Sequence, residues 1–372
     1  MKYKIPFIKP DFPAPDDISS DYEVMVESNW FTNFGPFEER FSAKIAEYVG
    51  CGARATTVNN ATSGLILSIL ALLGKGDGAS YIIMPSFTFV AGAQAVEWCG
   101  YRPFFVDINS DDFNMSIDHS EQLLMTRKNI SAILFCNSFG VGSTQIDEWE
   151  RLAAEYSVPL IIDSAAGFGS KYTDVEFVGA RGSCEVFSFH ATKPLAVGEG
   201  GAVTSRSPEL IQNIRQLQNF GFDVDRMTKL LGLNAKMQEL NAAIGLRQLS
   251  VHKERVLSRQ ATLRRYEQGL QDVIFQKNDN ISSVCFASVL IHEGNDRNAV
   301  IEKLQNKGVE ARAYYTPLHK QPYYSKNTSI NSVSLENTDA VSRRIVSLPV
   351  HDNMDDQSIQ CVIDNFNSST KK

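Results

Sequence analysis

The sequence predicts an α/β fold, with a large domain built on a mostly parallel sheet and a small C-terminal α+β domain. Between residues 55 and 205, short apolar or β-branched runs alternate with segments of helical length, as in sheets covered by helices on both faces. Residues 237–270 contain no proline and only two glycines, and their apolar residues recur at helical spacing. This stretch predicts a long helix, or a kinked pair, that joins two domains at residues 1–245 and 246–372.

Seven runs predict the strands of the large sheet. In chain order they are ATTVN, YIIMP, RPFFVDI, SAILFC, PLIID, EVFSFH and GAVTS. Between them, residues 62–73, 89–99 and 146–156 predict helices. In the small domain we expect strands at VCFASVLI, VEARAYY and VSLPV. We expect three helices there: one at residues 298–306, one that ends at residue 345 and one that begins at residue 355. The polar end NSSTKK predicts a frayed tail.

Composition and charge exclude several classes of protein. The chain has 372 residues, of which 43% are hydrophobic and 21% charged, as in ordinary globular proteins. A net charge of −7 argues against nucleic acid or an anionic membrane as partner, although a local patch can still bind a small anion. The longest apolar stretch, residues 64–74, is far shorter than the ~20 residues that cross a bilayer, and the N-terminal residues do not predict a signal peptide. The six cysteines are scattered, which predicts reduced thiols, no metal site and a cytoplasmic location.

Polar residues at the carboxyl ends of the strands are the first candidates for a site, because ligands of such sheets bind there. In NNATSG, Thr62 and Ser63 open a helix, so main-chain N–H groups and hydroxyls could bind a phosphate; the alternative is a plain N-cap by either residue. Asp163 ends an apolar strand, where a carboxylate needs a cation or a strong donor. A protonated cofactor ring would supply one, and an N-cap or an internal salt bridge is the alternative.

A lysine and two aromatic residues are further candidates. In FSFHATKP, strand alternation places Ser188 and His190 on one face, and Lys193 follows in a tight turn before a proline and GEGG. A lysine becomes a nucleophile or base when burial or a positive neighbour lowers its pKa; a solvated surface lysine is the alternative. In MPSFTFV, Phe87 and Phe89 are either core residues or a platform for a cofactor ring.

Six segments occur in a characteristic order: VNNATSGL, MPSFTFVAGAQAVEWCGYRPFFVDI, IIDSAAGFGS, VFSFHATKPLAVGEGGAV, GLNAKMQELNAAIGLRQL and YYTPLHKQPYY. Together they resemble the motifs of the pyridoxal-phosphate-dependent nucleotide-sugar aminotransferases, the DegT/StrS group. The resemblance extends over about residues 30–350, and SFHATK with GEGGAV is its most specific part. It implies the aspartate-aminotransferase-like fold (fold type I), with a mostly parallel seven-stranded sheet, a small C-terminal domain and a homodimer with shared active sites.

The resemblance also implies roles for single residues. Lys193 matches the lysine that binds pyridoxal 5′-phosphate covalently, Asp163 matches the partner of the ring nitrogen, and Phe89 matches the aromatic residue stacked on the ring. The phosphate ligands would be Thr62, Ser63 and Ser188, with Asn234 reaching in from the neighbouring subunit. Contacts to the substrate would come from Thr32, His190, Lys236, Tyr315 and His319.

The chain departs from the family's pattern at two places. Many members have Gln or His three residues after the aspartate, beside the cofactor's phenolic oxygen, and Ala166 stands there. Many also carry an aromatic residue and an arginine after the asparagine, where this chain has Ala235 and Lys236. The phenolic oxygen therefore has no assigned partner, and the contacts to the substrate's phosphates differ.

The implied activity is amino transfer from L-glutamate to a nucleotide-linked keto-deoxysugar by double displacement, with pyridoxamine 5′-phosphate as the intermediate cofactor form. The best candidate substrate is a dTDP-4-keto-6-deoxyhexose, which would give a 4-amino-4,6-dideoxy sugar. A 3-keto-sugar aminotransferase is one alternative, and a sugar dehydratase of the same group is another. In those dehydratases a histidine replaces the lysine, so Lys193 argues against them. A catalytically silent sensor is the non-enzymatic alternative, because a fold does not determine a function.

Overall fold

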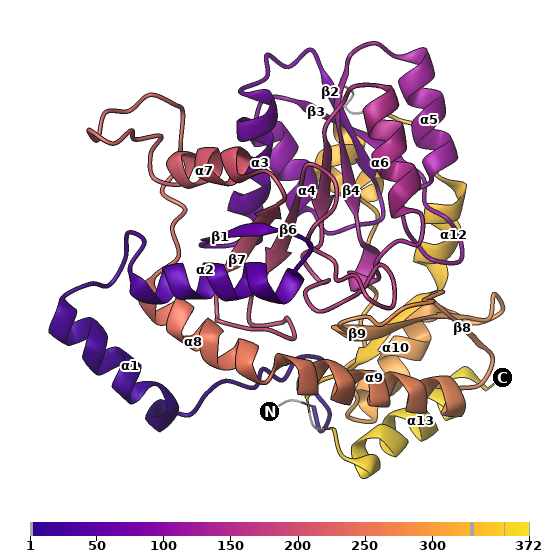
Figure 1. Ribbon diagram of the computed structural model, residues 1–372. Coiled ribbons are helices and arrows are strands. Elements are labelled where there is room, and N and C mark those ends of the chain that lie inside the picture. The colour runs from indigo at the N-terminus through magenta and orange to yellow at the C-terminus, as the bar shows by residue number, and fades with distance from the viewer. Residues whose placement is uncertain (1–2, 328–330, 353, 372) are drawn as a thin grey trace.

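The computed structural model describes residues 3–327, 331–352 and 354–371, and it is organised around one large sheet (Figure 1). The strand order is β1-β7-β6-β5-β4-β2-β3-β10. The neighbours from β6 to β10 run parallel, and β7 is antiparallel to both β1 and β6. The bounds are β1 (Arg54–Val58), β2 (Tyr81–Pro85), β3 (Arg102–Val106), β4 (Ile130–Cys136), β5 (Leu160–Asp163), β6 (Cys184–Ser188), β7 (Gly201–Ser205) and β10 (Asn331–Ser332).

All seven predicted strand runs are confirmed as strands of this sheet. The eighth strand, β10, was not foreseen, because it has only two residues and comes from the C-terminal part of the chain. It pairs with Phe104 and Phe105 and lengthens the parallel edge of the sheet.

Helices cover both faces of the large sheet, as the alternating pattern predicts. Successive residues of a strand point to opposite faces, so that Val186 and Phe187 enter two different apolar cores. One core is completed by α2 (Pro36–Val49), α5 (Ile117–Thr126), α6 (Ile146–Glu155) and α8 (Glu239–Ser250). The other is completed by α3 (Ala61–Leu73), α4 (Ala91–Trp98) and α7 (Pro208–Leu217).

The predicted long helix is a kinked pair. Helix α8 ends at Ser250 and α9 (His252–Gly269) follows at once, with Val251 (φ −109°, ψ 2°) between them. In Figure 1 the pair runs beneath the large sheet towards the C-terminal part of the chain.

A second, three-stranded sheet lies in the C-terminal part of the chain, with the order β11-β9-β8. Its strands are β8 (Val273–Phe275), β9 (Phe286–Ile291) and β11 (Ile345–Pro349). Helices α9, α10 (Arg297–Asn306) and α13 (Asp356–Thr370) enclose its apolar core, which Ile5 also joins. On this basis we propose to keep the division into domains 1–245 and 246–372. The remaining elements are α1 (Pro15–Ser28), η1 (Ser138–Gly140), η2 (Leu318–Lys320), α11 (Pro322–Lys326) and α12 (Glu336–Arg344).

Two expectations for the C-terminal part are wrong. VEARAYY is not a strand: Val309 bridges Ile5 and Arg312 bridges Ser347, so the run pairs with two different segments and builds no continuous ladder with either. The end of the chain is not frayed up to Thr370, because α13 continues to that residue. Asn367 ties it to the end of α9, donating to the Gly269 carbonyl (2.9 Å) and accepting from the Gln271 N–H (3.0 Å).

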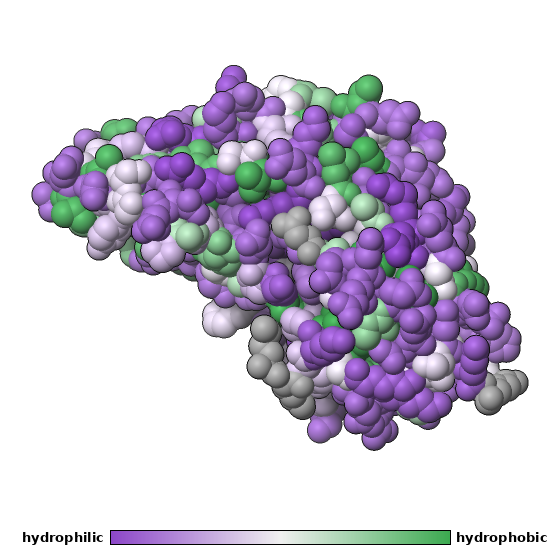
Figure 2. All heavy atoms as spheres, turned by 90° about the horizontal axis from the view of Figure 1, so that it is seen from below, coloured by the Kyte–Doolittle hydropathy of each residue, from purple (hydrophilic) through white to green (hydrophobic). Residues whose placement is uncertain are grey.

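The surface is mostly hydrophilic, and Figure 2 shows it from below with scattered apolar patches, some of them on the projecting part at the left. Exposed apolar residues include Tyr22, Val24 and Val26 on α1. Among the described residues, no helix has the length and apolar character needed to span a membrane.

The imidazole of His252 is buried where α9 begins. It packs against the rings of Tyr48 (5.7 Å) and Phe168 (5.2 Å), and its Nε2 lies 3.0 Å from the Phe168 carbonyl oxygen. The pKa of His252 is lowered to about 4, mainly by burial; the hydrogen bond to Phe168 opposes this shift, and the charges of Arg259 and Arg255 add to it. In the folded protein the His252 ring is therefore neutral near neutral pH and donates a hydrogen bond through Nε2.

This pKa predicts a pH-dependent loss of stability. Unfolded histidine titrates near ~6.5, so between pH 6.5 and 4 the unfolded chain binds a proton that the folded chain does not, and up to about 3 kcal/mol of stability is lost as the pH falls. Urea unfolding at pH 7.5, 6 and 5 measures the loss. In His252→Gln, which keeps a donor for Phe168 but cannot titrate, the loss should be smaller. Equal losses in both proteins would contradict this assignment.

Candidate active site

Register places the carboxyl ends of four strands in one row across the large sheet. Cys136 at the end of β4 lies opposite Asp163 at the end of β5. Asp163 lies opposite Val186, two residues before Ser188 ends β6. Ser188 and the last residue of β1, Val58, both pair with Gly201. Polar residues that follow these strands therefore meet at one edge.

The carboxylate of Asp163 is buried at this edge. One of its oxygens accepts the Ala165 N–H at 3.0 Å. Burial raises the pKa of Asp163, whereas the Ala165 N–H and the ammonium of Lys193 lower it. The thiol of Cys136 shares these surroundings and accepts a hydrogen bond from the Thr88 hydroxyl (3.3 Å); burial and the Asp163 charge raise its pKa. The structure thus brings Asp163 and Lys193 within electrostatic reach of each other.

Lys193 is partly buried in a turn that follows β6. Its N–H donates to the His190 carbonyl at 2.9 Å, and the Ala191 N–H donates to the Gly198 carbonyl at 2.8 Å, which closes the loop back towards β7. His190 contacts Thr192 within the loop (Nδ1 to Oγ1, 2.9 Å) and lies 3.7 Å from Glu199. The main chain thus holds the lysine at the edge of the sheet.

The N-terminus of α3 lies at the end of β1, in the same row. Asn60 caps it, because its side-chain oxygen accepts the Ser63 N–H at 2.8 Å. The cap is therefore neither Thr62 nor Ser63, and the alternative that made them caps is wrong. Both residues are partly exposed in the first turn, where the helix dipole favours an anion. A β-carbon at Gly201 would lie 2.9 Å from the Ala61 nitrogen, so glycine allows the close approach of β7 to this turn.

The two phenylalanines of MPSFTFV have different surroundings. Phe87 is 1% exposed and belongs to an apolar cluster, whereas the side chain of Phe89 is 59% exposed. The ring of Tyr315 lies 6.2 Å from Phe89 and stacks on Phe139 at 5.3 Å. Burial raises the pKa of Tyr315, and the nearby groups of Cys136, Cys285 and Asp163 raise it further. Phe89 is thus available as a platform, and Tyr315 lies within electrostatic reach of Asp163.

Asn234 and Lys236 lie on a segment that is hydrogen-bonded to the residue that follows β1. The Asn59 N–H donates to the carbonyl of Ala235, which is buried (2.8 Å). The ammonium of Lys236 donates to the side-chain oxygens of Asn234 (2.7 Å) and Asn219 (2.8 Å). Burial lowers the pKa of Lys236.

The other two predicted substrate residues are not brought to the Lys193 turn by any observed contact. Both ring nitrogens of His319 have partners, the Ser86 hydroxyl at 2.8 Å and the Asp339 carboxylate at 3.1 Å. Thr32 is exposed between α1 and α2, next to Phe31, whose carbonyl accepts the Glu239 N–H.

The sequence pattern of the DegT/DnrJ/EryC1/StrS aminotransferase family matches residues 15–367. The chain belongs to this family. Protein Rv3402c of Mycobacterium tuberculosis is 45% identical to it over 97% of this chain and 89% of that protein. The dTDP-4-amino-4,6-dideoxy-D-glucose transaminase of Shigella dysenteriae is 26% identical, over 98% of each chain. The GDP-perosamine synthase of Caulobacter vibrioides is 29% identical, over 96% of this chain and 97% of that one.

Solved structures agree with this membership. A putative PLP-dependent aminotransferase from Bacillus cereus superimposes with a TM-score of 0.91 at 30% identity, over 97% of this chain and 99% of that chain. DesI, determined with its TDP-sugar product, superimposes with a TM-score of 0.90 at 30% identity, over 100% of this chain and 94% of that chain. The protein is therefore a pyridoxal-phosphate-dependent enzyme of a sugar aminotransferase family, with the fold type I architecture.

The observed residues fit the cofactor. A buried carboxylate with few partners suits a protonated ring nitrogen, the exposed face of Phe89 suits an aromatic ring, and the start of α3 suits a phosphate. Ala166 has no polar side chain to offer the phenolic oxygen; its carbonyl lies 3.8 Å from the Cys285 thiol.

Sequence reasoning missed two contributors to this edge. Asn60 was hidden because it stands next to Thr62 and Ser63, which also have capping side chains. Cys136 could have been found, because it ends the run SAILFC at the same edge as Asp163.

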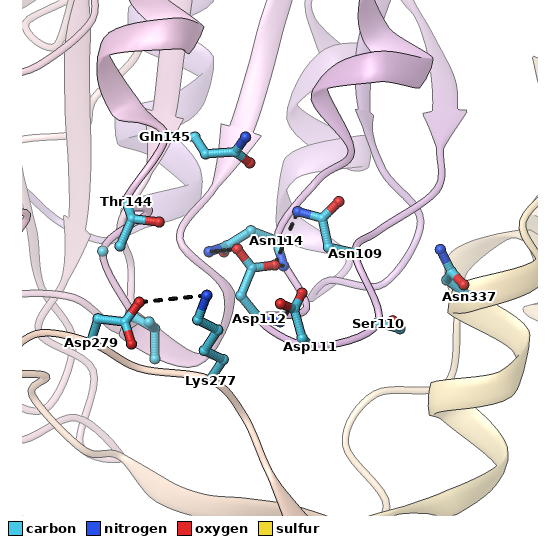
Figure 3. A pocket seen from close by; sticks show the side chains of 12 residues that line it. Asn109, Ser110, Asp111, Asp112, Asn114, Thr144, Gln145, Lys277, Asp279 and Asn337 are labelled. Carbon is cyan, nitrogen blue, oxygen red and sulfur yellow. Dashed lines mark hydrogen bonds and ion pairs between the residues drawn. The ribbon is translucent and has the colours of Figure 1, made fainter.

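A separate cavity of about 670 Å³ lies elsewhere, and none of the predicted site residues lines it (Figure 3). Its polar groups bind one another: Asp112 accepts from Asn109 (3.2 Å), and Lys277 lies 3.7 Å from Asp279. We assign no ligand to this cavity. Among the described residues, no group of three or more His, Cys, Asp or Glu side chains could hold a metal ion.

Proposed function

We propose that the enzyme transfers the amino group of L-glutamate to the keto group of a nucleotide-linked deoxysugar. The observation that carries this proposal is that Lys193 lies within electrostatic reach of the buried Asp163, at the strand ends of a sugar aminotransferase fold. A dTDP-4-keto-6-deoxyhexose is the best candidate acceptor, because relatives named for a 4-amino-4,6-dideoxy sugar match the chain over nearly its whole length. The free thiols of all six cysteines favour a cytoplasmic location.

Each residue at the edge has a distinct task in this proposal. When bound, the cofactor supplies the electron sink for the reaction. Lys193 acts first as nucleophile and then carries the proton between the substrate carbon and the cofactor. Asp163 keeps the positive charge on the ring nitrogen, and Phe89 supports the ring. The phosphate is bound by Thr62, Ser63 and Ser188.

The keto-sugar acceptor would enter beside these groups. Tyr315 and His190 are the nearest proposed contacts, since one lies against Phe89 and the other precedes the Lys193 turn. We keep Thr32, Lys236 and His319 as proposed contacts to the nucleotide-sugar. Because both ring nitrogens of His319 are already hydrogen-bonded, a polar contact of this ring with the nucleotide-sugar would require the exchange of one of these partners.

Lys193→Ala should abolish the covalent attachment of pyridoxal phosphate and lower the transamination rate by about 10³-fold or more, because the nucleophile and proton carrier is lost. Borohydride reduction followed by peptide mass spectrometry locates the attachment in the wild type. A variant that kept full activity and a reducible linkage would disprove the role of Lys193.

A panel of nucleotide keto-sugars with L-glutamate tests the acceptor. We expect the dTDP-4-keto-6-deoxy sugar to react with a kcat/KM at least about tenfold above its GDP-linked and 3-keto counterparts. Product mass and NMR give the aminated carbon. Preference for a 3-keto sugar would select the first alternative, and loss of a hydroxyl without gain of an amine would select the dehydratase.

We further propose a homodimer in which each subunit completes the other's site. Exposed apolar side chains on residues 220–231 and on α1 support it, because patches of this kind commonly mark interfaces. They include Phe220, Val224, Met227, Leu230 and Leu231. In Figure 1 the loop after α7 extends away from the large sheet, on the same side as α1. Asn234 lies at the base of this loop and would reach the partner's cofactor phosphate.

Subunit mixing tests the shared site. Homodimers of Lys193→Ala and of Asn234→Ala should both have very low activity, whereas an equal mixture should recover up to about one quarter of the wild-type activity, since half of the dimers then hold one intact site. Activity is measured after denaturation and joint refolding, with heterodimers verified by native mass spectrometry. If verified heterodimers recovered nothing, Asn234 would not act across the interface.

A further inference from the structure

A second carboxylate, that of Glu185 on β6, is fully buried behind the site and accepts four hydrogen bonds. One oxygen accepts the N–H groups of Gly179 (2.7 Å) and Arg181 (2.9 Å). The other accepts the hydroxyls of Ser164 (2.7 Å) and Tyr172 (3.0 Å). Burial outweighs these donors, which lower the pKa of Glu185, and the net result is a pKa raised to about 7. All four partners donate, so the surroundings suit the ionised form.

Asn137 fixes the direction of this network. Its amide nitrogen donates to the hydroxyls of Ser164 and Tyr172, both at 2.9 Å. Each hydroxyl therefore accepts from Asn137 and donates to Glu185. The side-chain oxygen of Asn137 is held by the Ser143 N–H at 3.1 Å.

The network reaches Asp163 by two routes. The main-chain N–H of Asn137 donates to the Asp163 carbonyl at 3.1 Å. Ser164 is the next residue of the chain, inside the turn in which the Ala165 N–H holds the Asp163 carboxylate. The Ser164 N–H donates to the Val186 carbonyl at 2.9 Å. With its hydroxyl bound to Glu185, Ser164 is fixed through both main chain and side chain.

We propose that Glu185 is a positioning residue for the cofactor site: ionised, it holds Ser164, and through Ser164 it keeps the Asp163 carboxylate in place opposite Lys193. The proposal rests on the role of Asp163 proposed above. Glu185 touches neither cofactor nor substrate and acts on them only through Asp163.

Substitutions separate this role from plain stabilisation of the core. In Glu185→Gln the amide N–H₂ would face two hydroxyls that already accept from Asn137, which leaves their hydrogens without partners. Ser164→Ala removes the hydroxyl that links Glu185 to the Asp163 turn but leaves Glu185 three of its donors. The two variants should therefore disturb Asp163 in the same way.

Glu38 provides a matched control. It is 1% exposed and accepts the hydroxyls of Thr57 (2.6 Å) and Ser42 (2.8 Å). It also forms an ion pair with Arg215 (3.2 Å), but no observed bond links it to Asp163. Glu38→Gln therefore disturbs a buried carboxylate of the same domain without reaching the proposed site.

The experiment uses the full-length protein loaded with pyridoxal phosphate, as wild type, Glu185→Gln, Ser164→Ala, their double variant and Glu38→Gln. The pH midpoint of the bound cofactor's visible absorption reports on the charge beside its ring; kcat and KM for L-glutamate are measured in parallel. For Glu185→Gln and Ser164→Ala we expect midpoints shifted in the same direction by about 0.5 unit or more, with kcat about tenfold lower and KM within about threefold. The double variant should be no worse than the more affected single variant, because both act on one path.

Glu38→Gln should lower the melting temperature and leave the midpoint unchanged. The proposal is overturned if the midpoint is unchanged in Ser164→Ala or in a folded Glu185→Gln, or if the double variant's shift is the sum of two independent shifts. If Glu185→Gln does not fold, Ser164→Ala alone decides. A wild-type protein that formed no reducible linkage at Lys193 would instead disprove the proposed function.

Discussion

The carboxylate of Asp163 ends a strand that is buried on both faces, and the role proposed for it depends on keeping it charged. Burial favours its neutral form, while one main-chain N–H and the ammonium of Lys193 favour the ionised form. A buried carboxylate with so few hydrogen-bond donors is stabilised when a cationic ligand binds beside it. Without such a ligand, a charge at this position has little reason to be present. The same balance explains why the chain surrounds the turn after Asp163 with further donors and acceptors.

The sheet supplies the geometry that this electrostatic arrangement requires. Parallel strands bring their carboxyl ends to one edge, and register aligns Cys136, Asp163 and Val186 across three strands. The antiparallel strand β7 then passes between β6 and β1, so that the start of α3 lies in the same row. The pairing of the strands thus brings together three groups that are distant in sequence: a lysine turn, a strand-end carboxylate and a helix N-terminus. These groups need no direct contacts with one another to reach the same edge.

Patterns that repeat along the chain could be predicted from the sequence, and single pairings could not. The seven apolar runs and the helical stretch of residues 237–270 follow from periodicity, which left open whether that stretch is one helix or a kinked pair. Lys193 and Asp163 stand out because they are charged residues at strand ends. VEARAYY has the composition of a strand, but its two neighbours in space each pair with only one of its residues. Glu185 sits inside an apolar run, and only the fold shows that four donors surround it. Asn367 is likewise held by bonds to the end of a different helix.

The contact between Lys236 and two asparagines has a consequence for the polarity of the surface. An ammonium has no lone pair, so the amides of Asn219 and Asn234 must both turn their oxygens towards it, and their N–H₂ groups face the other way. The orientation of these amides is therefore decided by a neighbouring charge before any ligand arrives. An acidic residue in place of Lys236 would reverse the orientation of both amides. Their N–H₂ groups, which can donate hydrogen bonds to an anion, would then turn inward, and the outward-facing oxygens would repel it.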